Sequence, residues 1–334
     1  MSGFYGRPRA LTWLLLSLLV WAACGGNLTS PASPDSDAAA VLVGAGDIGV
    51  CGSDAALATG RLLDAEPGTV FAAGDLAYNT GSAEDFLNCY DPAWGRQKSR
   101  TRPAPGNHEY VSPNAAPYFA YFGANAGMPG LGYYRYLAGA WQVYSLNSNG
   151  EAGSGAAEIQ WLKNELAARP AACSIAYFHH PMFSSGPHGL MAHAPVIHDL
   201  WMELYKAGAD IVISAHEHFY ERFAPQTPDG VADPTYGIRQ FVVGTGGAPP
   251  APALGRVPNS EVLLRTFGIL RLTLEPRSYR WEFVSADTRG VLDSGTGQCH
   301  AAKPAQEKYR RRSTRIQLDI TCVERTSSLF ITSF

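Results

Sequence analysis

The sequence predicts a layered α/β domain, in which two packed β-sheets are flanked by helices. Three observations support this fold class. Short apolar segments rich in β-prone residues recur from residue 41 onward, two segments with helical spacing lie between them, and the last part of the domain carries mainly strand patterns. Strands that alternate with helices and are then followed by a run of strands fit two sheets packed together and covered by helices.

The first strands are predicted where Val, Ile and aromatic residues cluster, at residues 41–43, 70–72, 141–146, 174–178 and 211–213. Residues 156–168 have apolar side chains at helical spacing, and the pattern ends at Arg169-Pro170. Residues 196–207 predict a second helix, which ends before Gly208. The later strands are predicted at residues 240–243, 269–274 and 280–284.

Two segments rich in Pro and Gly, residues 103–132 and 225–256, are predicted to be loops over or beside a site. The first contains a cluster of aromatic residues, namely Tyr118, Phe119, Tyr121, Phe122, Tyr133 and Tyr134. Such residues pack into a core more often than they line a binding site, and both interpretations stay open at this point.

The N-terminus predicts export. Arg7 and Arg9 precede an apolar run over residues 11–23, and small residues and Cys24 follow, so residues 1–24 have the pattern of a signal peptide. The run is shorter than the ~20 residues that span a bilayer. Ala22-Ala23-Cys24 also resembles a bacterial lipobox, except that Trp21 stands where an aliphatic residue is usual. Lipidation at Cys24 and simple secretion are therefore both open.

Composition describes an ordinary globular protein, with 16% charged residues, 46% hydrophobic residues and a pI near 6.3. No basic surface suited to nucleic acid is expected in the central region. Residues 25–40 are rich in Ser, Pro, Asp and Ala and predict a flexible linker. Residues 300–334 carry seven basic against three acidic residues and are expected to form a disordered tail; contact of residues 310–312 with anionic lipid is the alternative.

Five polar motifs lie between residues 45 and 218, most of them directly after a predicted strand. They are Ala45-Gly46-Asp47, Gly74-Asp75-Leu76-Ala77-Tyr78, Gly106-Asn107-His108-Glu109, His179-His180-Pro181 and Ala215-His216-Glu217-His218. Two cations held a few ångströms apart need a bridging carboxylate, with oxygen and imidazole ligands around it. On an extended segment, His216 and His218 point to the same side, so that one imidazole can reach each metal. The motifs therefore predict a two-metal hydrolase site.

In their order and completeness these motifs resemble those of purple acid phosphatases within the calcineurin-like metallophosphoesterases, whose pattern is GD, GDxxY, GNH[ED], VxxH and GHxH. The resemblance covers residues 41–299 and implies a compact, bacterial, single-domain form with a four-layer αββα sandwich. Ala176 replaces the usual Val and Ala215 the usual Gly, and neither change removes a ligand. The family's ligand in the fourth motif stands two residues before the proline, which assigns ligation to His179.

The resemblance implies a role for each residue of the motifs. The first metal is held by Asp47, Asp75, Tyr78 and His218, and the second by Asp75, Asn107, His179 and His216. Asp75 bridges the two metals, and the Tyr78 phenolate implies Fe(III) at the first site, with Zn, Mn or Fe(II) at the other. Glu109 and Glu217 are left outside the ligand set, because Glu217 on a strand end would point away from its neighbouring histidines.

Three residues are predicted to act on the substrate. Asn107 helps to present the phosphate, and His108 or His188 donates a proton to the leaving group, as an imidazole with an unperturbed pKa of about 6.5 can do. Both histidines are placed by their offsets in related enzymes.

Five cysteines remain if Cys24 is lipidated or removed. Cys51 and Cys89 follow two ligand aspartates, so they are expected on neighbouring loops at the edge of the site and are predicted to form a disulfide. Cys173–Cys299 is the second predicted pair, and Cys322 has no evident partner.

The resulting hypothesis is an exported two-metal phosphatase that hydrolyses phosphomonoesters by in-line attack of metal-bound hydroxide. Two alternatives stay open: a phosphodiesterase or nucleotide hydrolase with the same site, and a non-catalytic metal-binding surface lipoprotein. The expected partner is a small phosphate ester, without nucleic acid, and membrane contact is expected only through a lipid at Cys24. The oligomeric state is not predicted.

Overall fold

The computed structural model of the chain describes residues 39–150, 155–188 and 195–300. The predicted signal peptide with Cys24, most of the predicted linker, and the basic tail with Cys322 lie outside these residues. Among the helices of the described ranges, none is both long and apolar enough to cross a membrane.

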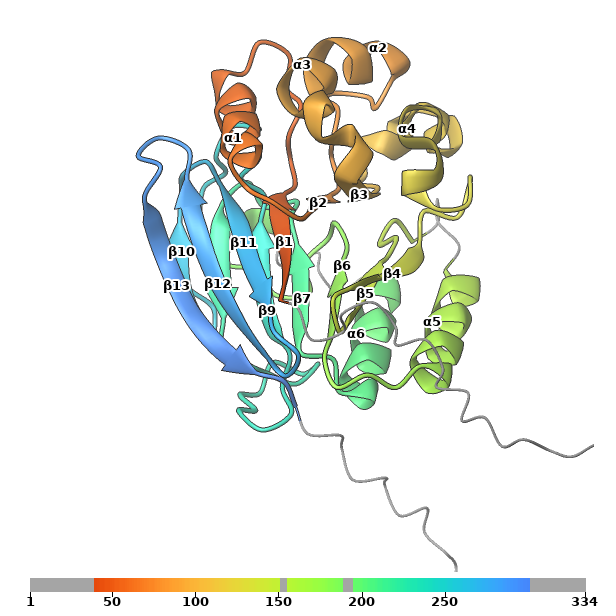
Figure 1. The fold of residues 1–334 in the computed structure, drawn as a ribbon, viewed down its shortest axis with the longest axis vertical. Helices are drawn as coiled ribbons and strands as arrows, with labels where there is room; N and C mark the ends of the chain where they lie inside the picture. Colours follow the sequence, from red (N-terminus) through yellow and green to blue (C-terminus); the bar gives the residue numbers. More distant parts are fainter. Residues whose placement is uncertain (1–38, 151–154, 189–194, 301–334) are drawn as a thin grey trace, which may run out of the picture. The chain divides into compact units, whose positions relative to one another are not determined.

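Two mixed β-sheets form the centre of the domain (Figure 1). The first has the order β13-β12-β11-β1-β2-β3 and the second the order β10-β8-β9-β7-β6-β5-β4. The strands of the first sheet are β1 (Ala40–Ala45), β2 (Thr69–Ala73), β3 (Thr101–Ala104), β11 (Gly268–Leu274), β12 (Ser278–Ser285) and β13 (Val291–Gln298). Those of the second are β4 (Tyr134–Ala138), β5 (Trp141–Ser145), β6 (Ser174–Tyr177), β7 (Ile211–Ser214), β8 (Tyr220–Phe223), β9 (Arg239–Val243) and β10 (Ser260–Leu264).

Parallel pairing occurs on one side of the first sheet and in the middle of the second. Strand β1 pairs in parallel with β2, and β2 with β3, while β11, β12 and β13 add antiparallel strands. In the second sheet β5, β6, β7 and β9 are parallel, and β4, β8 and β10 are antiparallel. Parallel strands place their carboxyl ends at one edge of a sheet, and this edge is where the polar motifs follow.

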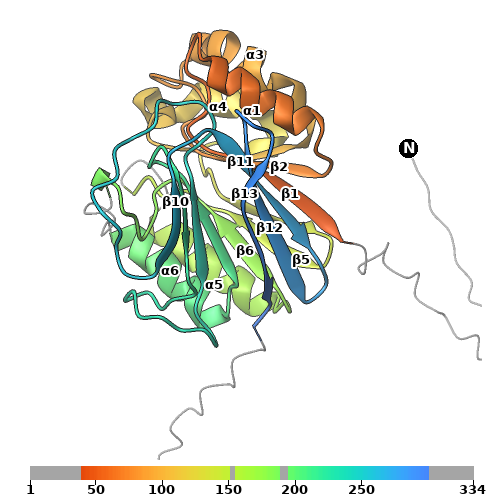
Figure 2. The ribbon, with the colours of Figure 1, turned by 90° about the vertical axis from the view of Figure 1, so that its left-hand side faces the viewer.

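The helices surround the sheets in two groups. They are α1 (Asp54–Asp64), α2 (Ala83–Asp85), α3 (Asp91–Trp94), α4 (Ala116–Phe122), α5 (Ala156–Ala168) and α6 (Pro195–Ala207). Short 3₁₀ or π turns cover Phe86–Tyr90, Gly95–Arg100, Glu109–Val111, Pro113–Ala115 and Gly123–Ala126. In Figure 2, α5 and α6 lie together against the second sheet, whereas α1 and α3 lie with the first.

Four layers form because the second sheet has apolar side chains on both of its faces. Side chains alternate along a strand, and on β7 Ile211 and Ile213 belong to the core between the sheets, whereas Val212 faces α5 and α6. On the helix side, Leu162 of α5 and Trp201 of α6 are fully buried with Val212. Both faces of the second sheet are therefore apolar, and each needs a covering layer. The predicted fold class, two packed mixed sheets flanked by helices, is confirmed.

The structure contains helices and strands that the sequence does not predict. The segment 103–132, predicted as a loop, contains α4, and its Tyr118, Phe119 and Phe122 are buried in the core, so these aromatic residues pack. Strands β3, β4, β8, β10 and β13 were not predicted. Strand β13 (Val291–Gln298) lies at the edge of its sheet, with alternating exposure and two glycines, and such a sequence has little strand pattern of its own.

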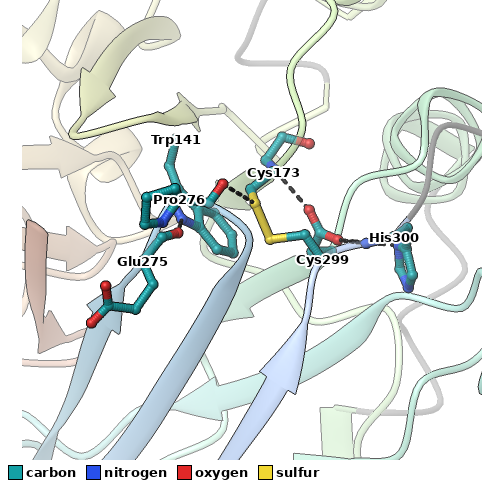
Figure 3. Close-up of a disulfide and its surroundings, with 8 residues drawn as sticks. Trp141, Cys173, Glu275, Pro276, Cys299 and His300 are labelled. Carbon is teal, nitrogen blue, oxygen red and sulfur yellow. Dashed lines mark hydrogen bonds and ion pairs between the residues drawn. A yellow bond between two sulfur atoms is a disulfide. The ribbon is translucent and has the colours of Figure 1, made fainter. Parts of the chain in front are cut away.

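Both predicted disulfides are present. Cys51 bonds to Cys89, and Cys173 to Cys299. Figure 3 shows the second bond beside Trp141 and His300. Cys299 directly follows β13 of the first sheet and Cys173 directly precedes β6 of the second, so this bond links the two sheets. Trp141 supports the same contact, because its indole N–H donates to the Glu275 carbonyl at 2.7 Å.

Candidate metal centre

The predicted ligands converge where the carboxyl ends of the parallel strands of both sheets meet. Asp47 follows β1, Asp75 follows β2, Asn107 follows β3, His179 follows β6, and the His-x-His segment follows β7. A direct link joins the two sheets here, because the His216 backbone N–H donates to Asp47 Oδ2 at 2.7 Å.

The backbone at this edge is forced into unusual conformations. Asp47, Asp75 and His216 have φ values of 56°, 52° and 68°, in the left-handed region that residues with a Cβ rarely adopt. Non-glycine residues held in such a conformation cluster at functional sites, where the surrounding structure stabilises them. Gly74 is required beside them, because a Cβ at this position would lie 2.5 Å from His179 Nδ1.

One group of donor atoms surrounds the Tyr78 hydroxyl. This hydroxyl lies 2.7 Å from Asp47 Oδ1, 3.2 Å from Asp75 Oδ2 and 3.3 Å from His218 Nε2. His218 Nε2 is also 3.3 Å from Asp47 Oδ1. The structure thus brings together the four residues predicted to hold the first metal.

A second group surrounds His179 Nε2. This nitrogen lies 3.2 Å from Asp75 Oδ2, 3.1 Å from Asn107 Oδ1 and 3.1 Å from His216 Nδ1. The four residues predicted to hold the second metal are therefore also together. Asp75 Oδ2 is common to both groups, which is the position a bridging carboxylate needs.

Hydrogen bonds to the backbone occupy the outer atoms of these side chains. The atoms that face the cluster keep lone pairs, which a cation can bind. Asp47 and Asp75 each accept a backbone N–H on one oxygen, from His216 and His108, and turn the other into the cluster. His179 Nδ1 lies 3.0 Å from the Ala73 carbonyl, and His218 Nδ1 lies 2.8 Å from the Pro249 carbonyl. A carbonyl can only accept, so these ring nitrogens donate, and each neutral ring keeps its Nε2 lone pair facing the other donors.

The electrostatics of the cluster favour positive charge. Burial lowers the pKa of His179 and His218, but Asp75 beside the first ring and Asp47 beside the second outweigh it, and both pKa values rise to about 9. Burial raises the pKa of Asp47, yet His218 holds it well below its usual range. A metal ion could compensate the charge of the two buried carboxylates in place of protons.

Similarity to known proteins agrees with this geometry. The sequence profile of the calcineurin-like phosphoesterase family matches residues 41–220, which is more than half of the chain. This chain belongs to the calcineurin-like phosphoesterase family. No curated protein matches the sequence at a significant level.

Solved structures share the fold of this phosphoesterase. Purple acid phosphatase PPD1 from yellow lupin (Lupinus luteus) seeds matches with a TM-score of 0.67 and 20% identity, over 80% of this chain and 55% of the lupin chain. GAP50, described as the anchor in the inner membrane complex of Plasmodium, matches with a TM-score of 0.62 and 15% identity. The match covers 79% of this chain and 90% of the GAP50 chain. PhoD matches with a TM-score of 0.53 and 11% identity, over 82% of this chain and 74% of the PhoD chain. The chain thus spans about half of the lupin enzyme's length.

Both predicted proton donors lie beside the predicted metal ligands. The His108 ring lies 4.3 Å from the Tyr78 ring between centroids, and its Nε2 is 3.7 Å from Asp75 Oδ2. The His188 ring lies 4.6 Å from the His216 ring, and its side chain is 45% exposed. The two histidines therefore approach the centre from opposite ligand groups, with enough exposure to meet a substrate.

The motif glutamates, left outside the ligand set, are both fully buried in the phosphoesterase. Glu109 accepts backbone N–H groups of Asp75, Leu76, Ala77 and Gly106 at 2.7–3.2 Å, so it fixes the loop that carries Asp75. Glu217 accepts the His188 backbone N–H at 2.7 Å. An acidic residue beside a motif histidine is the sequence signal for both, but only the structure shows what each carboxylate contacts.

Proposed function

We propose that the chain is an exported phosphatase that hydrolyses phosphomonoesters with two metal ions. The observation that carries the proposal is the pair of donor groups around Tyr78 and His179 that share Asp75 Oδ2. When bound, two cations would clamp the phosphoryl group and lower the pKa of a bound water molecule. Hard oxygen and imidazole donors suit iron, zinc or manganese, and Tyr78 favours Fe(III) in its group.

Each residue has a proposed role. Asp47, Tyr78 and His218 hold the first cation, His179 and His216 hold the second, and Asp75 bridges them. Asn107, whose Oδ1 lies 3.1 Å from His179 Nε2, binds the second cation and helps to orient the phosphate. His108 and His188 stand outside the ligand groups, where one of them can protonate the leaving oxygen.

Two observations, one from the sequence and one from the structure, support export. The first 24 residues have the pattern of a signal peptide, and the two disulfides are typical of proteins that fold in an oxidising compartment. Lipidation at Cys24 would anchor the enzyme outside the cytoplasm, and cleavage without lipidation would release it. Mass spectrometry of the mature N-terminus distinguishes the two.

The experiment that tests this function measures turnover of p-nitrophenyl phosphate and of its bis-ester from pH 4 to 10. The full chain is compared with Asp75→Asn, which keeps the side-chain shape but loses the bridging charge. Asp64→Asn is the matched control, because Asp64 is exposed and pairs with Arg96 on the surface. Metal content and melting temperature of each variant show whether the fold is intact.

Faster turnover of the monoester, lost in Asp75→Asn and kept in Asp64→Asn, is the expected result. Preference for the bis-ester would replace the proposal with a phosphodiesterase. Two bound metals without turnover of either ester would leave the non-catalytic alternative.

A further inference from the structure

Two buried glutamates lie beneath the segment 184–188, which carries His188. Glu217 and Glu221 both have no exposed surface, and neither carboxylate belongs to the proposed metal ligands. Burying a carboxylate costs free energy unless it is paired or hydrogen-bonded. The groups that each one contacts therefore show what it does in the fold.

Glu217 contacts His188 at two points. Its Oε1 accepts the His188 backbone N–H at 2.7 Å, and its Oε2 lies 3.4 Å from His188 Nδ1. The approach is so close that position 186 must be glycine, since a Cβ on Gly186 would lie 2.2 Å from Glu217 Oε2. The carboxylate therefore lies against the backbone of this segment and faces one edge of the His188 ring.

Glu221 holds the start of the same segment. Its Oε2 accepts the Ser185 backbone N–H at 2.9 Å, and its Oε1 accepts the hydroxyls of Ser185 and Ser260. The Ser185 carbonyl in turn accepts the Leu254 backbone N–H at 2.9 Å. Ser185 is thus fixed from two directions, so the position of the backbone at His188 is determined even though its side chain is half exposed.

We propose that Glu217 is a positioning residue for His188. Its carboxylate faces Nδ1 and selects the tautomer in which Nδ1 carries the hydrogen, which leaves Nε2 as the ring nitrogen that meets a bound phosphate ester. Glu217 stands between His216 and His218, so one short segment supplies two metal ligands and orients the histidine that contacts the substrate. This inference rests on the proposed function.

A double-mutant cycle tests the coupling of the two residues. Glu217→Gln, His188→Ala and the double variant are compared with the unsubstituted chain for kcat and KM on p-nitrophenyl phosphate. Glutamine keeps the shape of Glu217 and can still accept the backbone N–H. We expect each single variant to lose about 10- to 100-fold in kcat, and Glu217→Gln to cause no further loss once His188 is alanine. Additive losses would overturn the proposal.

Two controls separate positioning from damage to the fold or to the metal site. Each variant must bind as much metal as the unsubstituted chain. Glu282→Gln, which changes a partly buried glutamate paired with Arg271 in the first sheet, should leave kcat unchanged.

A second measurement does not depend on turnover. In the zinc-loaded full chain, ¹⁵N NMR of the histidine rings reports which nitrogen of His188 is protonated, with the signal assigned by its loss in His188→Ala. We expect hydrogen on Nδ1, and loss of that preference in Glu217→Gln. The same tautomer in both proteins would overturn the proposal. A tautomer that depends on Glu217 in a protein without phosphatase activity would contradict the proposed function and keep the positioning role.

Discussion

Individual residues at the metal centre adopt conformations that other residue types would not tolerate. Asp47, Asp75 and His216 have positive φ, and a Cβ at Gly74 would lie 2.5 Å from His179 Nδ1. These positions follow from the sharp turns at the strand ends, which aim polar side chains from separate strands at one point. Substitutions at these positions should lower metal affinity.

Tyr78→Phe tests the proposed iron site. Burial, Asp47 and Asp75 raise the pKa of Tyr78 well above its usual range, so only a bound cation would make its phenolate stable. We expect a visible tyrosinate-to-iron absorption band in the iron-loaded chain and its loss in Tyr78→Phe. Tyr279→Phe, a buried tyrosine of β12, is the control that should keep the band. An active, metal-replete chain without any such band would contradict iron(III) at this site.

Gly74→Ala should weaken metal binding and the fold together. Gly74 has a φ of 83°, and a Cβ there would lie 2.5 Å from His179 Nδ1. We expect a loss of about 1–3 kcal/mol of stability and a lower metal content, measured by urea unfolding and by metal analysis. The control is Gly52→Ala, at a φ of 76° with nothing within 4 Å of the added Cβ. If both variants bind metal equally, contact with His179 is not the cause.

The buried carboxyl group of Glu158 should make the stability of the fold depend on pH. Burial raises its pKa from 4.5 to about 8, and in the described residues only the Asn147 backbone N–H, at 2.7 Å, bonds to its carboxyl. The folded state keeps this proton while the unfolded state releases it near pH 4.5, so the contribution of Glu158 to stability falls as pH rises from 4.5 to about 8. Urea unfolding at pH 5 and pH 8 should show a smaller decline for Glu158→Gln than for the unsubstituted chain. An equal decline would contradict the shift.

At the scale of elements, strand β6 has a distinct role at each of its two ends. Strand β6 begins beside Cys173, where the disulfide to Cys299 links the two sheets, and ends before His179 at the metal centre. Asp210 strengthens the first end, because its carboxylate accepts the backbone N–H groups of Ser174 and His300 at 2.8 and 2.7 Å. The contacts that stabilise the domain therefore lie at one end of β6, and the predicted metal ligand His179 lies at the other.

Replacing both Cys173 and Cys299 by serine should lower stability and spare catalysis. The bond joins residues 126 positions apart, and closing such a loop restricts the unfolded chain, which is worth about 2–5 kcal/mol. We expect a lower urea midpoint with kcat nearly unchanged at 25 °C, because the ligands lie at the other end of β6. A large loss of kcat in the folded double variant would show that the sheets also transmit this constraint to the metal centre.

At the scale of the whole domain, the two sheets form one site that neither contains alone. Asp47, Asp75, Tyr78 and Asn107 come from loops of the first sheet, and His179, His216 and His218 from loops of the second. A cation held by ligands from both sheets would link them at the end of β6 opposite to the Cys173–Cys299 disulfide. Metal binding and folding should therefore be linked.

Chelation tests this linkage. Removing the metals leaves Asp47 and Asp75 buried without their cation, so the melting temperature should fall by several degrees and recover when zinc or iron is added back. Asp75→Asn should respond much less to the chelator, because the bridging ligand is absent. Equal melting curves with and without chelator, at matched pH, would argue that the metals contribute nothing to the fold.

The sequence by itself determined the fold class, the positions of the main strands along the chain and the family, because apolar periodicity and motif order are local properties of a chain. It also predicted both disulfides, which the structure confirms. It also named the residues that the structure brings together around Asp75. It did not predict α4 or the edge strand β13 (Val291–Gln298), whose positions depend on packing against other elements. Nor did it assign Glu109 and Glu217, because the fate of a buried carboxylate depends on which distant backbone N–H groups and side chains the tertiary structure places beside it.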